Sequence, residues 1–312
     1  MTMHLLFVFF FLLQTISASV CNPKNIPNRR DLRADQLTIL ISGFSESRLP
    51  LLRSLSASYA SSPSVAAVLI LWCNPETPSR TLSQFFSPPV ASASPISIHR
   101  SSSTSLNARF LPRRSIPTRA VAVCDDDVEI DPASLEFSFK IWQSNPDRIV
   151  GFFARSHDYD LEQRSWIYTV RPDRFSIVLT KFMILDVKYL WQYSCSGDEY
   201  TAAARRVVDE MRNCEDILMN FVVAEATGAG PILVGGKKVR DWGDARNEGG
   251  ERMREVGLST REGHRKMRGD CIRMFHKAFD KMPLKYSYGK MVAEVGEQGL
   301  CEKGGKLVFC DE

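Results

Sequence analysis

An apolar run that ends abruptly in three acidic residues constrains the fold of this chain more than any other feature. The run Ala120–Cys124 has the composition of a buried β-strand, and Asp125, Asp126 and Asp127 follow it directly. In sheets of parallel strands flanked by helices, ligands bind at the edge where the carboxyl ends of the strands meet. The pattern therefore predicts an α/β fold with its chemistry at the end of this strand.

The acidic triplet itself has two interpretations. Side chains alternate along a strand, so Asp125 and Asp127 are expected on one face while Asp126 points away. Two converging carboxylates with no lysine nearby indicate a site for a hard divalent cation, which keeps some waters and takes further oxygen ligands from a substrate diphosphate. The alternative is a solvated acidic turn before a helix that begins at Asp131-Pro132. The triplet alone leaves both interpretations open.

Length and charge exclude some classes of function. At 312 residues the chain is long enough to bury a full core, as one large domain or two small ones. Its formal net charge is only +4, and its basic residues are dispersed except between Arg252 and Arg273. This argues against nucleic acid as the main partner.

Residues 1–20 resemble a membrane signal. Leu5–Leu13 is strongly apolar, and Ser17–Ser19 has the small residues of a cleavage site, although no lysine or arginine precedes the segment. It is short for a membrane span, so a cleaved signal peptide and a retained signal anchor both fit. Either one places the chain from Cys21 onward in the secretory lumen, where disulfides persist. Residues 21–35, which contain two prolines, predict a short stem.

The eight cysteines become informative in that compartment. Cys73 and Cys124 lie in apolar strand runs, which predicts buried thiols. Four others lie in polar surroundings and could pair: Cys214, Cys271, Cys301 and Cys310. The last two flank a pair of glycines, which favours a hairpin disulfide.

Hydrophobic periodicity predicts alternating strands and helices. Leu37–Ser42 and Val65–Trp72 read as strands on either side of a helix at Leu49–Tyr59, which makes a parallel βαβ unit. Two aromatic runs, Trp166–Val170 and Phe175–Thr180, predict a hairpin. The remaining predicted elements are strands at 96–99 and 149–153, helices at 132–142, 201–212, 213–221 and 272–281, and a mobile loop at 239–260.

Charged residues beyond the triplet also have two interpretations each. Asp216 lies three residues after Asn213 at a predicted helix start, where it could be a capping carboxylate or a catalytic group. Cations cluster beside glycines between Arg261 and Cys271. They could hold a diphosphate through charge-assisted hydrogen bonds or form a solvated helix face.

Several separate stretches together resemble one family, the exostosin-like glycosyltransferases of family 64, and in particular its plant members. The acidic triplet alone is weak evidence, whereas the stretch around Asp216 together with Met-Pro-Leu-Lys-Tyr-Ser is strong. The matching stretches are Val68–Asn74, Ser105–Phe110, Asp125–Asp127, Asn213–Phe221 and Met282–Ser287. Their order and spacing are similar to those of the family's catalytic domain.

The resemblance implies a GT-A fold over residues 36–312, a nucleotide-sugar-binding α/β domain with a mixed, mostly parallel sheet flanked by helices. It also implies Mn²⁺ as the cofactor at Asp125 and Asp127, and retention of anomeric configuration. The residues that it assigns to substrate are Arg48, Asn74, Asn107, Arg109, Asp125, Asp126, Asp127 and His264. Arg48 departs from the family pattern, because animal members have an Asn-Arg directly after the aromatic of this turn and this chain has Phe44-Ser45-Glu46-Ser47-Arg48.

The resemblance further implies a catalytic pair. Asp216 would face the reacting sugar, and Arg268 matches the family's essential arginine. A disulfide between Cys214 and Cys271 would hold the loop of Arg268 beside Asp216. Departure of a sugar from a nucleoside diphosphate develops negative charge on the leaving oxygen and positive charge on the anomeric carbon. Asp216 could then act as electrostatic stabiliser, nucleophile or acceptor-orienting base, and the sequence leaves all three open.

We therefore expect a metal-dependent, retaining hexosyltransferase. Resemblance to the plant members implies transfer of mannose from GDP-mannose to glycosyl inositol phosphorylceramide, a sphingolipid, at the Golgi membrane with the catalytic domain in the lumen. The alternatives are an N-acetylhexosaminyltransferase with a UDP-sugar donor and a non-catalytic sugar-binding protein. The expected partners are a nucleotide-sugar donor, a glycolipid or glycan acceptor and the membrane, and a homo-oligomer is compatible with the sequence.

Overall fold

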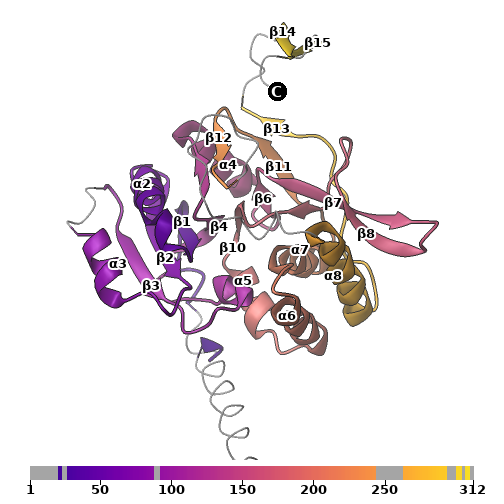
Figure 1. The fold of residues 1–312 in the computed structure, drawn as a ribbon, viewed down its shortest axis with the longest axis horizontal. Coiled ribbons are helices and arrows are strands. Elements are labelled where there is room, and N and C mark those ends of the chain that lie inside the picture. The colour runs from indigo at the N-terminus through magenta and orange to yellow at the C-terminus, as the bar shows by residue number, and fades with distance from the viewer. Residues whose placement is uncertain are drawn as a thin grey trace, which may run out of the picture.

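The structure is a computed structural model that describes residues 20–22, 27–87, 92–243 and 263–293, and the backbone of 300–303 and 306–309. Its centre is an eight-stranded sheet in the order β13-β11-β6-β10-β4-β1-β2-β3 (Figure 1). The strands are β1 (Arg33–Gly43), β2 (Val65–Trp72), β3 (Ile96–Arg100), β4 (Thr118–Asp125), β6 (Val150–Gly151), β10 (Phe182–Asp186), β11 (Ile232–Gly235) and β13 (Met291–Val292).

Most neighbouring strands run parallel. β1 pairs in parallel with both β2 and β4, and β2 pairs in parallel with β3. The predicted βαβ unit is therefore confirmed. β10 is antiparallel to β4 on one side and to β6 on the other. The mixed, mostly parallel sheet expected from the sequence is present.

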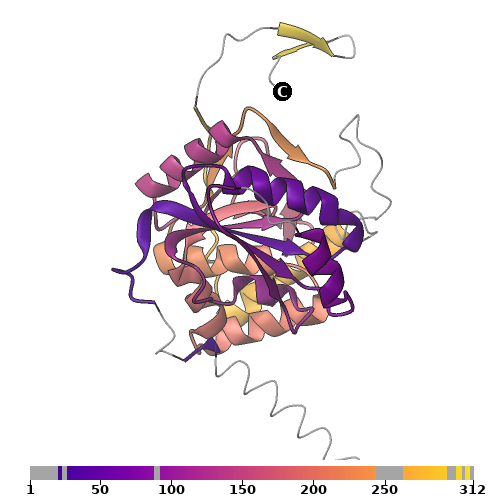
Figure 2. The ribbon, with the colours of Figure 1, turned by 90° about the vertical axis from the view of Figure 1, so that its left-hand side faces the viewer.

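Helices cover both faces of this sheet, as Figure 2 shows. Alternate residues of β1 enter two separate cores, with Leu40 on one face and Ile39 and Ile41 on the other. Helices α5 (Lys188–Cys195), α6 (Glu199–Met211), α7 (Glu215–Thr227) and α8 (His264–Phe279) supply the first core, and α2 (Leu49–Ala60), α3 (Ser79–Phe85) and α4 (Pro132–Ser144) supply the second. Because strands covered on both faces are apolar throughout, β4 could be recognised from its composition.

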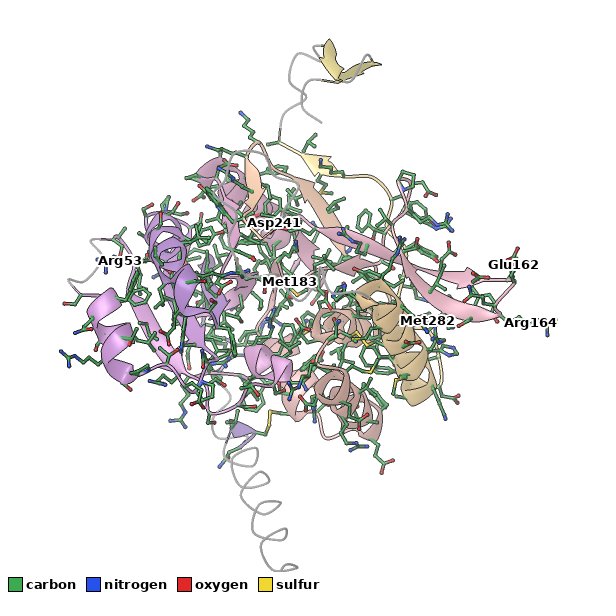
Figure 3. All side chains as sticks on the ribbon, in the orientation of Figure 1. Arg53, Glu162, Arg164, Met183, Asp241 and Met282 are labelled. Atoms are coloured by element: carbon green, nitrogen blue, oxygen red, sulfur yellow. A yellow bond between two sulfur atoms is a disulfide. The ribbon has the colours of Figure 1, made fainter. Side chains whose placement is uncertain are left out.

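The predicted hairpin between Trp166–Val170 and Phe175–Thr180 is wrong. The two runs form β8 (Ser165–Thr169) and β9 (Ile177–Val178), and both pair with β7 (Ala154–Asp160) instead of with each other. β7 was missed because its sequence, ARSHDYD, is mostly polar. Glu162 and Arg164 mark the tip of the β7–β8 hairpin, which projects from the eight-stranded sheet (Figure 3). Met183, on β10, lies near the centre of that sheet.

The predicted loop at residues 239–260 is wrong at its start. Strand β12 (Val239–Asp241) pairs antiparallel with β5 (Val128–Ile130), which directly follows the acidic triplet. The rest of that predicted loop lies outside the described residues. So does the predicted pairing of Cys301 with Cys310, although the backbones of β14 (Leu300–Lys303) and β15 (Lys306–Phe309) form the expected hairpin.

The segment predicted as a stem is attached to the folded part at two points. A disulfide joins Cys21 to Cys195 at the end of α5, and Arg29 forms an ion pair with Asp186 at 2.9 Å. The sequence did not predict either contact. Residues 1–19 lie outside the described residues. Among the helices that the structure does describe, none is long and apolar enough to cross a membrane.

Candidate active site

Three parallel strands end together at one edge of the sheet. In the register of the sheet, Ser42 lies beside Asp125, and Gly43 lies beside Trp72. The segments that follow β1, β2 and β4 therefore leave the sheet side by side. This is the edge at which the sequence predicted the chemistry.

Arg48 binds two of the three acidic residues. It ends the short helix η2 (Glu46–Arg48), and its Nη1 lies 2.7 Å from Oδ1 of Asp126 and 2.9 Å from Oδ2 of Asp127. The prediction that Asp126 points away from Asp127 is wrong, because β4 ends at Asp125 and the chain then turns. Arg48, to which the sequence analysis assigned an arginine role at the substrate, is thus paired with the acidic triplet.

Arg109 binds the third acidic residue and links it to α7. It lies in the short helix η3 (Leu106–Phe110), and its Nη1 is 2.9 Å from Asp125 Oδ1 and 3.2 Å from Glu215 Oε1. Thr180 Oγ1 donates a further hydrogen bond to Glu215 at 3.2 Å. Sequence reasoning missed Glu215. The available signal was a carboxylate at the start of a helix that is apolar on all sides and therefore buried.

Arg268 and Asp216 form a buried ion pair. Arg268 Nη2 donates to Asp216 Oδ2 at 2.6 Å, and Nη1 donates to Asn213 Oδ1 at 3.2 Å. The guanidinium also lies 4.5 Å from the ring centroid of Tyr168. Arg268 is only 5% exposed, which rejects a solvated helix face. Its Nε is buried and has no hydrogen-bond partner among the described residues.

The predicted disulfide between Cys214 and Cys271 is present. Cys214 directly precedes α7 and has a left-handed backbone with φ of 76°. Arg268 lies on helix α8, three residues before Cys271, and not on a loop as expected. The disulfide therefore joins the start of α7 to α8 next to the pair of Asp216 and Arg268.

Negative charge exceeds positive charge at this edge. The five carboxylates named above face three arginines, and burial together with the charge of Asp125 raises the pKa of Asp127 to about 7. Such crowding of hard oxygen donors at Asp125 and Asp127 fits a divalent cation. Among the described residues no three histidine, cysteine or acidic side chains converge as a complete metal site. A cation here would draw its other ligands from water or substrate.

The segment after β12 closes one side of Asp127. The backbone N–H of Trp242 donates to the carbonyl of Asp127 at 2.7 Å, and its indole donates to Glu129 at 3.0 Å. Asp241, labelled in Figure 3, pairs with Lys181. A Cβ on Gly243 would lie 2.3 Å from Oδ2 of Asp127, so a larger residue there would require the Asp127 carboxylate to move. The sequence analysis did not predict these contacts, because it interpreted residues 239–260 as a loop.

Three other predicted site residues have contacts within the fold. Asn74 accepts a hydrogen bond from the backbone of Glu76, and His264 begins α8, where burial and the charge of Arg268 lower its pKa. Asn107 is joined to α6, because its amide donates to Asp209 at 2.9 Å and to a backbone carbonyl of that helix. The substrate contacts expected of these three residues stay predictions.

Comparison with known proteins finds a matching family model and similar sequences. Residues 37–296 match the Glycosyl transferase family 64 domain. The chain is 59% identical over 299 residues to Glycosyltransferase family protein 64 C3 of Arabidopsis thaliana, an alignment that covers 93% of this chain and 90% of that protein. It is also 37% identical over 191 residues to Exostosin-1 of Papio anubis and of Mus musculus, covering 61% of this chain and 24% of each relative.

Proposed function

Because this chain belongs to glycosyltransferase family 64, we propose that it is a retaining, Mn²⁺-dependent hexosyltransferase that transfers mannose from GDP-mannose to glycosyl inositol phosphorylceramide. Membership of the family makes it a glycosyltransferase, with a nucleotide-sugar donor and an acceptor as its substrates. The identities of the donor and the acceptor rest on the resemblance of the sequence to plant members. The metal and the catalytic roles rest on the site.

The observation that carries the proposal is that α7 links the acidic triplet to the ion pair of Asp216 and Arg268. Glu215 and Asp216 are neighbours on this helix, and each binds a different arginine. Glu215 reaches through Arg109 to Asp125 at the end of β4. Asp125, which is suited to a cation, and Asp216, which is suited to the sugar, are thereby connected through adjacent residues of one helix.

Asp125 and Asp127 would hold Mn²⁺, which when bound offsets the negative charge that develops on the leaving diphosphate. Arg109 and Arg48 lie against the same two carboxylates and can add hydrogen bonds to phosphate or ribose oxygens. These cations stabilise the leaving group most when its charge is largest, which favours the transition state over the bound donor.

Asp216 is held rigidly for a role at the reacting sugar. Its Oδ2 accepts from Arg268, and its Oδ1 accepts from the backbone N–H of Ile217 at 2.8 Å. A carboxylate fixed at both oxygens is suited to stabilising positive charge on the anomeric carbon. Arg268 positions it and keeps its Nε–H for a ligand. The roles of nucleophile and acceptor-orienting base remain for kinetics to distinguish.

A lumenal Golgi location is part of the proposal. Two disulfides, Cys21–Cys195 and Cys214–Cys271, support an oxidising compartment, since such bonds are rare in the cytosol. We further propose that residues 1–20 attach the protein to the membrane, which would place the site near a lipid-linked acceptor.

Donor hydrolysis by the purified full-length protein tests the function. GDP-mannose, UDP-N-acetylglucosamine and further nucleotide sugars are supplied singly, with Mn²⁺ or with EDTA, and release of free nucleotide is measured. We expect Mn²⁺-dependent release of GDP from GDP-mannose, slow by hydrolysis when water is the acceptor and faster by transfer of mannose when glycosyl inositol phosphorylceramide is present. Preference for the UDP-sugar would reject the proposed donor. Absence of turnover with every donor, in a protein that still binds nucleotide, would favour the non-catalytic alternative.

A further inference from the structure

Arg48 holds one carboxylate that is suited to a cation and one that is not. Its Nη1 contacts both Asp127 and Asp126, at 2.9 Å and 2.7 Å. The side chain of Asp127 is 14% exposed and that of Asp126 is 7% exposed. The arginine thus has its shorter contact to the more deeply buried partner.

Arg109 likewise contacts one more exposed and one more buried carboxylate on the other side of the triplet, although its shorter contact, 2.9 Å, is to the more exposed Asp125. Its Nη1 contacts Asp125, whose side chain is 29% exposed, and Glu215, whose side chain is 8% exposed. We call Asp125 and Asp127 the outer carboxylates, and Asp126 and Glu215 the inner carboxylates. Each arginine therefore joins one outer and one inner carboxylate.

The arrangement matters because the arginines occupy the outer carboxylates. A divalent cation that binds there must displace a guanidinium or accept its repulsion. The arginine side chains are themselves only 13% and 11% exposed. Without another anion, a displaced guanidinium would be left buried and unpaired, which is strongly unfavourable. Cation binding would then be weak.

We propose that the inner carboxylates are reserve partners, which keep Arg48 and Arg109 in the site when a divalent cation takes the outer carboxylates. The inference rests on the proposed function, because it takes the outer carboxylates as the cation ligands. The N–H groups released from the outer carboxylates then become available to the donor diphosphate. Arg48 also has a buried Nε with no hydrogen-bond partner among the described residues, so it keeps a further donor for such a ligand.

A double-mutant cycle on Arg48 and Asp126 tests the proposal. Mn²⁺ is titrated by calorimetry into the full-length protein without nucleotide, for the wild type, Asp126→Asn, Arg48→Met and the double variant. We expect Asp126→Asn to weaken Mn²⁺ binding by about tenfold, because Asp127 is then the one remaining carboxylate that Arg48 contacts among the described residues. Arg48→Met should tighten binding by about tenfold, because the competing cation is gone. In the Arg48→Met background, Asp126→Asn should change the affinity by less than about threefold.

The cycle separates this role from a general effect of charge. If Asp126 acts only through its field on the metal, Asp126→Asn weakens binding equally with and without Arg48, and the proposal is overturned. Arg33→Met removes a positive charge at the amino edge of the sheet, where Arg33 contacts only Asp35 among the charged groups of the described residues, and should leave the affinity unchanged.

A second cycle, Glu215→Gln with Arg109→Met, repeats the measurement on the other side should an Arg48 variant fail to fold. Coupling of the same sign supports the reserve role, and additive effects overturn it. Absence of Mn²⁺ binding in the folded wild type refutes the proposed cation site and the inference with it. Mn²⁺ binding without coupling refutes the inference alone.

Discussion

Arg268 on α8 and Asp216 on α7 lie 2.6 Å apart, from Nη2 to Oδ2, and both side chains are less than 8% exposed. The disulfide between Cys214, which directly precedes α7, and Cys271 on α8 joins the same two helices. A buried ion pair is weak evidence for stability, since desolvation offsets much of its attraction. A pair that is also cross-linked beside a predicted cation site is better explained by the orientation that it imposes on Asp216.

Arg268→Lys should therefore lower turnover far more than donor binding. Lysine keeps the charge but not the planar fork that reaches Asp216 and Asn213 together. We expect turnover to fall by roughly 10²-fold, with donor affinity changed by less than about tenfold. Arg268→Ala should in addition destabilise the fold by about 3–5 kcal/mol, because it leaves Asp216 buried without its partner. Steady-state kinetics, donor titration and urea unfolding check these outcomes. Near-normal turnover in both variants would contradict the assigned role.

Asp127→Ala should abolish Mn²⁺-dependent nucleotide binding and transfer while leaving the fold intact. The residue lies in the turn after β4, and its removal also relieves the crowding of carboxylates, so the cost to stability should stay within about 1 kcal/mol. Calorimetric titration with GDP and UDP, with and without Mn²⁺, measures the effect. If the nucleotide affinity of the variant still depended on Mn²⁺, Asp127 would not be a ligand of the cation.

Loss of the Cys214–Cys271 disulfide should impair both stability and catalysis. It closes a separation of 57 residues, so replacing both cysteines by alanine should cost about 4 kcal/mol in the chain-entropy picture. Turnover should fall as well, because Arg268 lies three residues from Cys271. The matched control replaces Cys21 and Cys195, whose disulfide joins the stem to α5. We expect that control to lower stability with little effect on the turnover of folded protein. Equal loss of turnover in both variants would argue against a local role.

Arg29→Ala should destabilise the protein in a pH-dependent manner. Asp186 is fully buried, and burial raises its pKa above the ordinary 3.8, while the backbone N–H of Lys188 and the charge of Arg29 act in the opposite direction. Without Arg29 the folded-state pKa should rise further. At a pH below the ordinary pKa of 3.8, Asp186 is protonated in both the folded and the unfolded state. The variant should then have the same stability as the wild type.

As the pH rises through the folded-state pKa of Asp186, the variant should become less stable than the wild type by about 1 kcal/mol. Urea unfolding at pH 4 and pH 7 measures this difference. Arg30→Ala, which alters the adjacent exposed arginine, serves as the control and should be neutral at both values. A difference that is equal at pH 4 and pH 7 would exclude Asp186 as its source.

The sequence alone determined the central strands and the edge of the sheet at which we propose that the chemistry lies. Strands covered by helices on both faces must be apolar throughout, so β4 and the abrupt change at Asp125 were visible in the composition. Family motifs likewise indicated Asp216, Arg268 and the disulfide beside them. The strand and its end are encoded locally, because each depends on a short run of residues, whereas the disulfide, with a sequence separation of 57, was indicated only through the resemblance to the family.

Only the tertiary structure decided which charges meet. Arg48 and Asp126 lie 78 residues apart in the chain, and no local pattern reports their contact. The pairing of β7 with both β8 and β9, and the attachment of the stem through Cys21, were hidden for the same reason. Hydrophobic periodicity states that a segment is buried and on which face, but not what it is buried against. The partner of a strand or of a charged side chain is set by the packing of the whole domain.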